Sequence, residues 1–262
     1  MNGENLKYLY GPVPSWRLGR SLGVDVLSQA DKICNFDCVY CQLGRTAYCP
    51  ARRVEFVDAK DIAGELASLP AVELDYVTFS GRGEATLASN LGQTLAESRQ
   101  ARKEQTALIT NSVLLADADV RKETAGFDFV VAKLDACDDA LLNEINRPVV
   151  PVKMREIVSG LCAFRAQYGG RLAIQTMFIE ANASEIENFS GLYAQIKPDE
   201  IEVNTPLRPS PVQPLPQKRL ADIADALREK LPGMKIKTVY EAEKPDAAPI
   251  SGPETLRRRG KI

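Results

Sequence analysis

Short apolar runs alternate with helical patterns along most of this chain, and this alternation limits the fold more than any other feature. Strands are predicted over residues 21–27, 74–79, 106–110, 127–134, 172–179 and 200–204. Helices are predicted over residues 58–69, 91–102, 116–125, 138–145, 152–168 and 184–196. Repeated βα units form an α/β protein with parallel strands and right-handed crossovers. A doubly wound sheet and a curved β/α barrel both satisfy this order, and both bind ligands at the carboxyl ends of the strands.

The two ends of the chain break the alternation. Residues 10–20 contain two prolines and two glycines, so we expect no regular structure there. A proline-rich stretch at 207–216 reads as a linker or crossover, and a helix at 217–231 and a strand at 234–240 follow it. The tail from Glu243 onward is predicted to be loosely ordered. We therefore divide the chain into a core, 1–206, and a short C-terminal extension, 207–262.

The composition excludes several kinds of chemistry. The 262 residues include no histidine, which removes Ser-His and Cys-His nucleophiles and His-ligated metals. Lys and Arg number 33 against 35 Asp and Glu, so a strongly basic nucleic-acid binder is disfavoured. No apolar run reaches the roughly 18 residues of a membrane span, and the polar N-terminus lacks a signal-peptide core. We expect a cytoplasmic protein that does not associate with membranes, in which clustered cysteines indicate metal binding or catalysis.

Three of the six cysteines, Cys34, Cys38 and Cys41, lie within eight residues of a loop expected at 31–50. Iron–sulfur clusters and zinc are the usual centres for such a group. Structural zinc takes four protein ligands, and Cys49 lies eight residues further on, beyond the usual spacing of a zinc pair. Three ligands on a four-iron cube leave one iron open. The alternative is a non-catalytic, zinc-binding interaction protein that uses these three cysteines and Cys49.

This Cys-x-x-x-Cys-x-x-Cys motif, with Tyr40 before its last cysteine and a predicted strand before its first, resembles the radical S-adenosylmethionine (SAM) superfamily. The resemblance implies a partial (β/α)6 TIM-like barrel and a [4Fe–4S] cluster held by the three cysteines. It implies an enzyme that reductively cleaves SAM to methionine and a 5′-deoxyadenosyl radical, which abstracts hydrogen from a substrate. It also implies a low-potential electron donor, ferredoxin or flavodoxin, and a place for Tyr40 near the adenine.

Two further segments match the superfamily after the next two strands. Gly81, Gly83 and Glu84 resemble its Gly-Gly-Glu-Pro segment, which implies that they hold the methionyl amine of SAM. Glycines there also let the backbone approach a ligand closely. Thr110 and Asn111 resemble its Thr-Asn-Gly segment, and polar side chains at a strand end can bind ribose hydroxyls. From the residues alone, a tight turn explains either segment nearly as well.

Lys133 lies near the end of the strand at 127–134, and Asp135 directly follows that strand. A lysine in an apolar strand is costly to bury unless it is paired, so Lys133 is expected to reach a carboxylate. The resemblance implies that this segment contacts SAM, with Lys133 on the methionyl carboxylate. An ion pair with Glu84 or Asp135 is the alternative. Arg147 is a second candidate contact for an anion.

Later strands supply two more candidate SAM contacts, Gln175 within the strand at 172–179 and Asn204 at the end of the strand at 200–204. Asn204 is a candidate for the adenine, with a turn as the equal alternative. Residues 11–25 and 42–46 resemble a group of short iron–sulfur oxidoreductases often grouped with wyosine-base-forming tRNA enzymes. Members of that group continue past residues 256–259 into a small helical domain that we expect to be absent here. Three substrate classes stay open: a tRNA base, a partner protein as for activases, and a small molecule.

Overall fold

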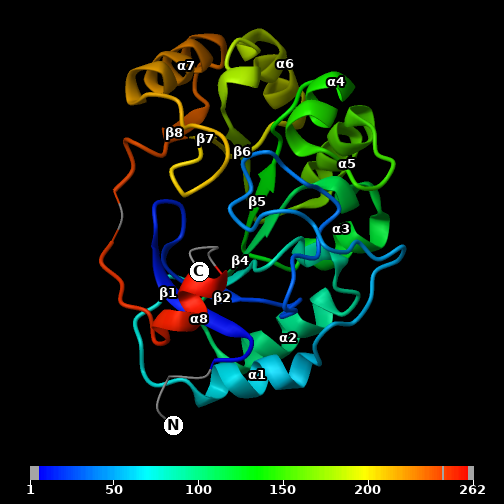
Figure 1. The fold of residues 1–262 in the computed structure, drawn as a ribbon, viewed down its shortest axis with the longest axis vertical. Coiled ribbons are helices and arrows are strands. Elements are labelled where there is room, and N and C mark those ends of the chain that lie inside the picture. Colours follow the sequence, from blue (N-terminus) through cyan, green and yellow to red (C-terminus); the bar gives the residue numbers. More distant parts are fainter. Residues whose placement is uncertain (1–5, 244, 259–262) are drawn as a thin grey trace.

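A computed structural model of the protein describes residues 6–243 and 245–258. Its centre is one eight-stranded sheet in which the strands follow the order of the chain, curled into a half-barrel (Figure 1). The first two strands pair antiparallel, and every later neighbour pairs parallel. The strands are β1 Leu9–Ser15, β2 Gly19–Val24, β3 Tyr76–Phe79, β4 Gln105–Thr110, β5 Phe129–Lys133, β6 Arg171–Met177, β7 Glu200–Asn204 and β8 Lys235–Thr238. This is the partial TIM-like barrel that the sequence predicted.

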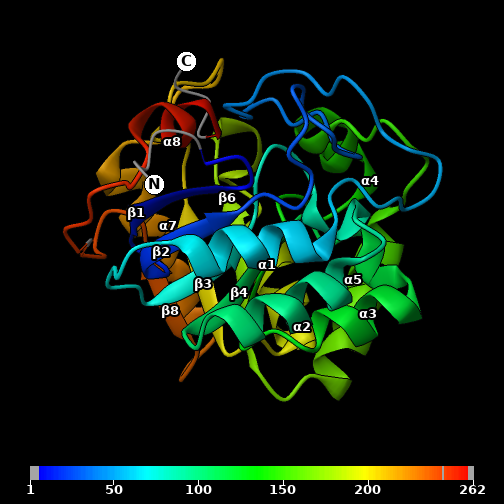
Figure 2. The ribbon, with the colours of Figure 1, turned by 90° about the horizontal axis from the view of Figure 1, so that it is seen from below.

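Helices cover the convex face of the sheet and follow its curve, as Figures 1 and 2 show from two directions. Asp117 begins one of them by accepting hydrogen bonds from the backbone N–H groups of Asp119 and Val120, as expected of an N-cap aspartate. The α-helices are α1 Ala59–Ser68, α2 Leu91–Ala101, α3 Ala118–Thr124, α4 Asp139–Leu141, α5 Met154–Gln167, α6 Ile186–Ile196, α7 Gln217–Lys230 and α8 Gly252–Arg258. The short helical turns are η1 Ala85–Leu87, η2 Val113–Ala116, η3 Leu142–Asn146 and η4 Glu180–Asn182.

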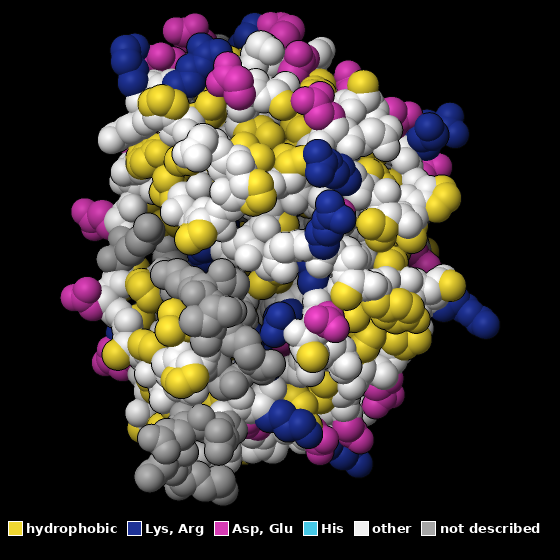
Figure 3. Space-filling model, viewed as in Figure 1, with side chains coloured by type: hydrophobic (Ala, Val, Ile, Leu, Met, Phe, Trp, Pro, Cys, Tyr) yellow, Lys and Arg dark blue, Asp and Glu magenta, His cyan; other side chains and the backbone are white. Residues whose placement is uncertain are grey.

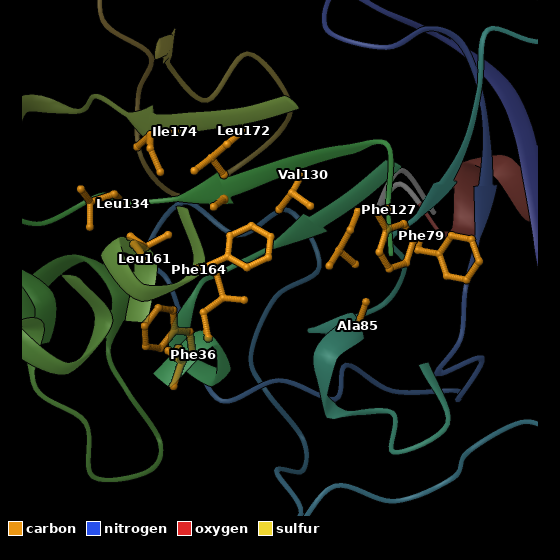
Figure 4. Close-up of a cluster of buried hydrophobic side chains, with 14 of the residues drawn as sticks. Phe36, Phe79, Ala85, Phe127, Val130, Leu134, Leu161, Phe164, Leu172 and Ile174 are labelled. Carbon is orange, nitrogen blue, oxygen red and sulfur yellow. The ribbon is translucent and has the colours of Figure 1, made fainter. Parts of the chain in front are cut away.

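The sheet is buried on both faces, which explains why its strands read as nearly continuous apolar runs. Alternate residues of β5 divide between two cores. Val130 packs toward the helices, in the cluster that contains Leu161 and Phe164 of α5 (Figure 4). Val131 packs on the concave face in a smaller cluster with Leu18. The concave face is therefore apolar near the start of the strands, which leaves their carboxyl ends for polar side chains.

The prediction that residues 10–20 lack regular structure is wrong. They contribute most of β1, an edge strand whose pairing with β2 is irregular between Tyr10 and Val13. Proline is tolerated on edge strands and at bulges because no ladder hydrogen bond is required of it there. Turn-forming residues were therefore compatible with a strand. Because this strand pairs antiparallel with β2, the sheet is mixed and not all parallel as expected.

The expectation of a loosely ordered tail after Glu243 is also wrong for part of that tail. Helix α8 packs on β1, and the side-chain hydroxyl of Thr255 accepts a hydrogen bond from Gly11 N at 2.9 Å. The buried guanidinium of Arg258 lies 3.3 Å from the buried carboxylate of Asp25. Residues 207–216 are a crossover between β7 and α7, and β8 extends the same sheet. The functional division of the chain after residue 206 stays a prediction.

Replacing Arg258 with Met should destabilise the fold by about 3 kcal/mol, because it leaves the buried carboxylate of Asp25 without its counter-ion. Urea denaturation at neutral pH measures the difference. Arg219→Met on the exposed face of α7 is the control and should change the free energy of unfolding by less than about 0.5 kcal/mol. Equal midpoints for the two variants would show that the C-terminal helix does not contribute to folding.

Candidate functional site

The cysteine loop, residues 31–50, leaves the carboxyl end of β2 and covers the carboxyl ends of the neighbouring strands. Cys34 is buried, and Cys38 and Cys41 are half-buried. A cleft of about 770 Å³ lies against the loop and is lined by both half-buried cysteines. Its apolar walls are Val39 and Ile145, with further apolar residues after β6 and near residue 212. The three cysteines of the motif are thus brought to one edge of the sheet beside an open cleft.

The sulfurs of two of these cysteines accept hydrogen bonds from N–H groups. Cys34 Sγ accepts from Phe36 N at 3.4 Å and from Asn111 Nδ2 at 3.8 Å. Cys38 Sγ accepts from Asn146 Nδ2 at 3.4 Å. Burial raises the pKa of Cys38 to about 11 and raises that of Cys34 further, so both thiols hold their protons at neutral pH unless a metal displaces them. Asn146 was not predicted, and Asn111 was expected at a ribose rather than at a sulfur.

Lys32 is a second residue that sequence reasoning missed. Its side chain is 3% exposed and lies inside the cysteine loop. Its Nζ donates to Gly44 O at 3.1 Å and lies 3.7 Å from Asp37 Oδ1. Burial acts to lower the pKa of Lys32, but the neighbouring sulfurs of the three motif cysteines outweigh burial and raise it. A basic residue two positions before a cysteine motif was the available signal.

The Gly81–Glu84 segment holds the first cysteine in place through the backbone. Ile33, the residue before Cys34, donates its N–H to Arg82 O at 3.0 Å and accepts from Glu84 N at 2.9 Å. A Cβ on Gly83 would lie 1.6 Å from Ile33 O, so only glycine fits there. The close approach that the sequence predicted for a ligand is made by the protein's own chain at this position.

Glu84 is buried, and its carboxylate accepts hydrogen bonds from three residues. Thr86 donates its N–H at 3.1 Å and its hydroxyl at 2.6 Å, and Thr110 donates its hydroxyl at 2.7 Å. Asn111 donates its N–H to the second oxygen at 2.7 Å. Burial raises the pKa of Glu84, and these bonds act against the shift. The second and third sequence motifs are therefore joined by one carboxylate, which positions Asn111 against Cys34.

Asp135 is a second buried carboxylate that joins separate segments, on the other side of the cysteine loop. Its carboxylate accepts from the hydroxyl of Tyr40, from Asn146 Nδ2 at 3.0 Å and from Met177 N at 2.7 Å. Lys133 Nζ lies 3.1 Å from the same carboxylate, with its side chain 17% exposed. Of the two protein partners considered for Lys133, the structure shows Asp135 and not Glu84.

A polar row continues from Lys133 across the concave face of the sheet. Lys133, Gln175 and Glu202 occupy paired positions on β5, β6 and β7. Gln175 Nε2 donates to Glu202 Oε2 at 2.7 Å, and Arg17 Nε approaches the same oxygen to 4.0 Å. Glu202 is fully buried, and burial raises its pKa to about 7, with Arg17 and Lys237 opposing the shift and Glu200 adding to it. Glu202 was not predicted.

The remaining candidates lie in two places. Arg147 lines the cleft and has a left-handed backbone conformation with φ of 47°. Asn204, at the end of β7, accepts from the N–H of Thr205 through its own side chain. Arg147 therefore shares the cleft with the cysteines, and Asn204 caps a turn at the strand end.

The donor set fits an iron–sulfur cluster. Such clusters require thiols that converge from one loop, and hydrogen bonds to the sulfurs tune them; here the sulfurs of Cys34 and Cys38 accept from N–H groups. Within residues 6–243 and 245–258, no group of three or more His, Cys, Asp or Glu side chains is arranged to hold a metal ion. The ligands of a four-iron cube stand further apart than those of one ion. Cys49 Sγ lies instead 3.8 Å from Pro50 O.

Comparison with known proteins decides the family. The model of the radical SAM superfamily matches residues 32–166, which spans the cysteine motif and the three segments after it. The chain belongs to the radical SAM superfamily. The expectation from the sequence is confirmed, and the chain is an enzyme rather than the non-catalytic zinc protein considered as the alternative.

A UPF0026 protein of Synechocystis is 41% identical over 206 residues, which cover 78% of this chain and 77% of that relative. Among solved structures, anSMEcpe with bound AdoMet superposes with a TM-score of 0.63 at 15% identity, over 84% of this chain and 64% of that one. Archaeal TYW1 superposes with a TM-score of 0.56 at 17% identity, over 80% of this chain and 72% of that one. At these low identities, the two structures show that this radical SAM enzyme has the same fold as they do.

Enzymes of this superfamily typically require a reductant. Across the part of the chain that the structure describes, no helix is long and apolar enough to cross a membrane.

The polar row gives this radical SAM enzyme a testable pH dependence. Because the pKa of Glu202 is raised from 4.5 to about 7 on folding, the folded state binds its proton more tightly. The contribution of Glu202 to stability is therefore full below pH 4.5 and is lost as the pH rises through 7. Between pH 4.5 and pH 8, the free energy of unfolding should fall by about 3 kcal/mol less in Glu202→Gln than in the wild-type protein. Urea denaturation at the two pH values measures this difference.

Glu200→Gln, two residues earlier on β7, is the matched control. Burial opposes the ionised form of Glu200, but Arg171 and Lys235 outweigh burial and lower its pKa. Its stabilising effect is present at high pH and is lost as the pH falls. Because Glu200 also adds to the raised pKa of Glu202, its removal should flatten the profile far less than the removal of Glu202 itself. A profile that is equally flattened by both substitutions would contradict the assignment to Glu202.

Proposed function

We propose that the protein binds a [4Fe–4S] cluster through Cys34, Cys38 and Cys41 and uses it to cleave SAM reductively. With the cluster bound, an electron passed to SAM yields methionine and a 5′-deoxyadenosyl radical, which abstracts hydrogen from the substrate. The observation that carries the proposal is the loop that gathers three cysteines beside a cleft of about 770 Å³, in a chain of this superfamily. Cys38 and Cys41 line the cleft, so a cluster held by the three cysteines would face it.

The cleft offers suitable contacts for each part of SAM. Its walls include Val39, Ile145 and Ile179, which provide an apolar surface for a flat adenine ring. Tyr40 packs with Ile145 and Ile179 in one buried cluster, so it supports the apolar wall proposed for the adenine. Arg147, which lines the cleft, supplies positive charge for the methionyl carboxylate. Lys133 does not line the cleft, and its part-exposed side chain is the second candidate for this carboxylate.

The methionyl amine and the ribose are assigned to the strand ends beside Cys34. Where a side chain would project from Gly81 and Gly83, the protein's own Asp25 and Ile33 already lie, so these glycines are proposed to act through their backbone alone. The carboxylate of Glu84 already accepts from Thr86, Thr110 and Asn111. We therefore give Glu84 and Thr110 a positioning role in this proposal. Asp135, Gln175 and Asn204 support the site through the hydrogen bonds described above. Residues 1–206 form the catalytic core of the proposal, with 207–262 as its extension.

The electron is proposed to come from a ferredoxin or a flavodoxin in the cytoplasm, where thiols remain reduced. Lys and Arg side chains gather near the middle of the face in Figure 3, while most Asp and Glu side chains lie toward its rim. A donor with a negatively charged surface complements such a face and associates faster with it. The substrate classes, a tRNA base, a partner protein and a small molecule, stay predictions.

Anaerobically reconstituted protein should contain about four iron atoms per chain, as expected of one cubane cluster. Alanine at Cys34, Cys38 or Cys41 should abolish the iron–sulfur absorbance, and iron analysis checks this. Cys49→Ala is the control and should retain both the iron and the colour. Loss of the cluster in the Cys49 variant would revive a site with four thiolates. Protein with a cluster that releases no 5′-deoxyadenosine from SAM after reduction would contradict the proposed chemistry.

Lys133→Met should weaken SAM binding by roughly 2–3 kcal/mol, because a charge-assisted hydrogen bond is lost. It should also lower the free energy of unfolding, because the buried carboxylate of Asp135 loses its counter-ion, so folding and iron content are measured first. The loss in SAM binding corresponds to roughly 30- to 160-fold in Kd, measured by calorimetric titration of the protein with its cluster. The control is Lys237→Met, which should bind SAM normally. Lys237 continues the polar row on β8, but it pairs with Glu200. Unchanged affinity in the Lys133 variant would restrict this lysine to its ion pair with Asp135.

A further inference from the structure

The cysteine loop is closed around a buried lysine. Lys32 is 4% exposed, and the loop returns to it on several sides. Its Nζ donates to the carbonyl of Gly44, and its own carbonyl accepts from Ala47 N at 3.1 Å. The next residue, Ile33, is fixed to Arg82 by a backbone hydrogen bond. The position of the ammonium inside the loop is thus determined by the fold and not by a flexible side chain at the surface.

The positive charge of Lys32 is only partly neutralised by protein. The nearest carboxylate within the described residues is that of Asp37, at 3.7 Å. That carboxylate is 26% exposed, and it also accepts from Thr46 N at 2.9 Å. The ion pair between Lys32 and Asp37 is weak, because the two charges are not in direct contact, the carboxylate also meets solvent, and the same oxygen accepts from Thr46. A buried charge is stabilised fully only by close and complete pairing. The loop that encloses Lys32 also carries Cys34, Cys38 and Cys41, so the charge of the ammonium acts on their sulfurs as well.

A cation in this position acts on any cluster that the three sulfurs hold. Thiolate ligands give the cluster a negative charge, and reduction adds one more electron to it. Net charge, hydrogen bonds to sulfur and solvent exposure set the potentials of iron–sulfur clusters. A fixed positive charge in a poorly solvated loop stabilises the reduced form more than the oxidised form.

We infer that Lys32 raises the reduction potential of the cluster by holding a positive charge inside the cysteine loop. Lys32 touches neither SAM nor substrate in this scheme, so it is a positioning residue that acts through the cluster. The inference rests on the proposed function, because it requires a cluster on Cys34, Cys38 and Cys41. It goes beyond that function by assigning the control of electron uptake to a residue outside the ligand set.

The test is a potentiometric titration of the reconstituted protein without SAM, followed by electron paramagnetic resonance of the reduced cluster. Lys32→Gln should lower the equilibrium constant for reduction by about tenfold or more, which is a shift of 59 mV or more for one electron. Lys32→Arg keeps the charge and should shift the potential far less. Lys60→Gln on the exposed side of α1 is the control and should leave it unchanged.

Asp37→Asn supplies the opposite change. It removes the carboxylate that partly neutralises Lys32, so the potential should rise. Opposite shifts in the two variants are not expected if Lys32 only closes the loop. Should Lys32→Gln fail to retain its cluster, Lys32→Met is the second variant with the same expected loss, and an unchanged potential in it would overturn the inference. An unchanged or lowered potential in Asp37→Asn would also overturn it, because the charges in the loop would then not act on the cluster. Wild-type protein that holds no four-iron cluster would contradict the proposed function instead.

Discussion

The buried carboxylate of Asp135 is the contact on which the geometry of the site depends. It accepts hydrogen bonds from Tyr40 in the cysteine motif, from Asn146 at the end of η3 and from Met177 at the end of β6, and it pairs with Lys133. A buried carboxylate is expensive unless all its partners are present, so these segments must meet together or not at all. One carboxyl group thereby fixes the cysteine loop to the ends of two strands.

Glu84 fixes the loop from the other side by the same means. It holds the end of β4 through Thr110 and Asn111, and Asn111 in turn donates to the sulfur of Cys34. Asp135 reaches the sulfur of Cys38 through Asn146. Each carboxylate thus acts on a cysteine through an asparagine amide. The loop itself has little regular structure, and these two networks explain how it presents three sulfurs in a defined arrangement.

The parallel sheet converts distant sequence motifs into neighbours. Strands β2 to β8 run in one direction and in sequence order, so the residue after each strand reaches the same edge. The segments after β2, β3, β4 and β5 supply the cysteines, Glu84, Asn111 and Asp135 in turn. The chain order of the motifs is therefore also their order around the edge of the half-barrel, and the cleft lies where the loop covers that edge.

The sequence by itself determined the order of most strands and helices and the three cysteines, because local periodicity and short spacing carry that information. The half-barrel rather than a doubly wound sheet was implied by the resemblance to the radical SAM superfamily. It did not determine what Glu84 and Lys133 contact, since both partners depend on which strands become neighbours. Nor did it show the strand at β1, where an edge position tolerates proline, or the burial of Lys32. Those features were decided by tertiary structure, because burial and pairing are properties of groups far apart in the chain, and only the folded sheet sets their distances.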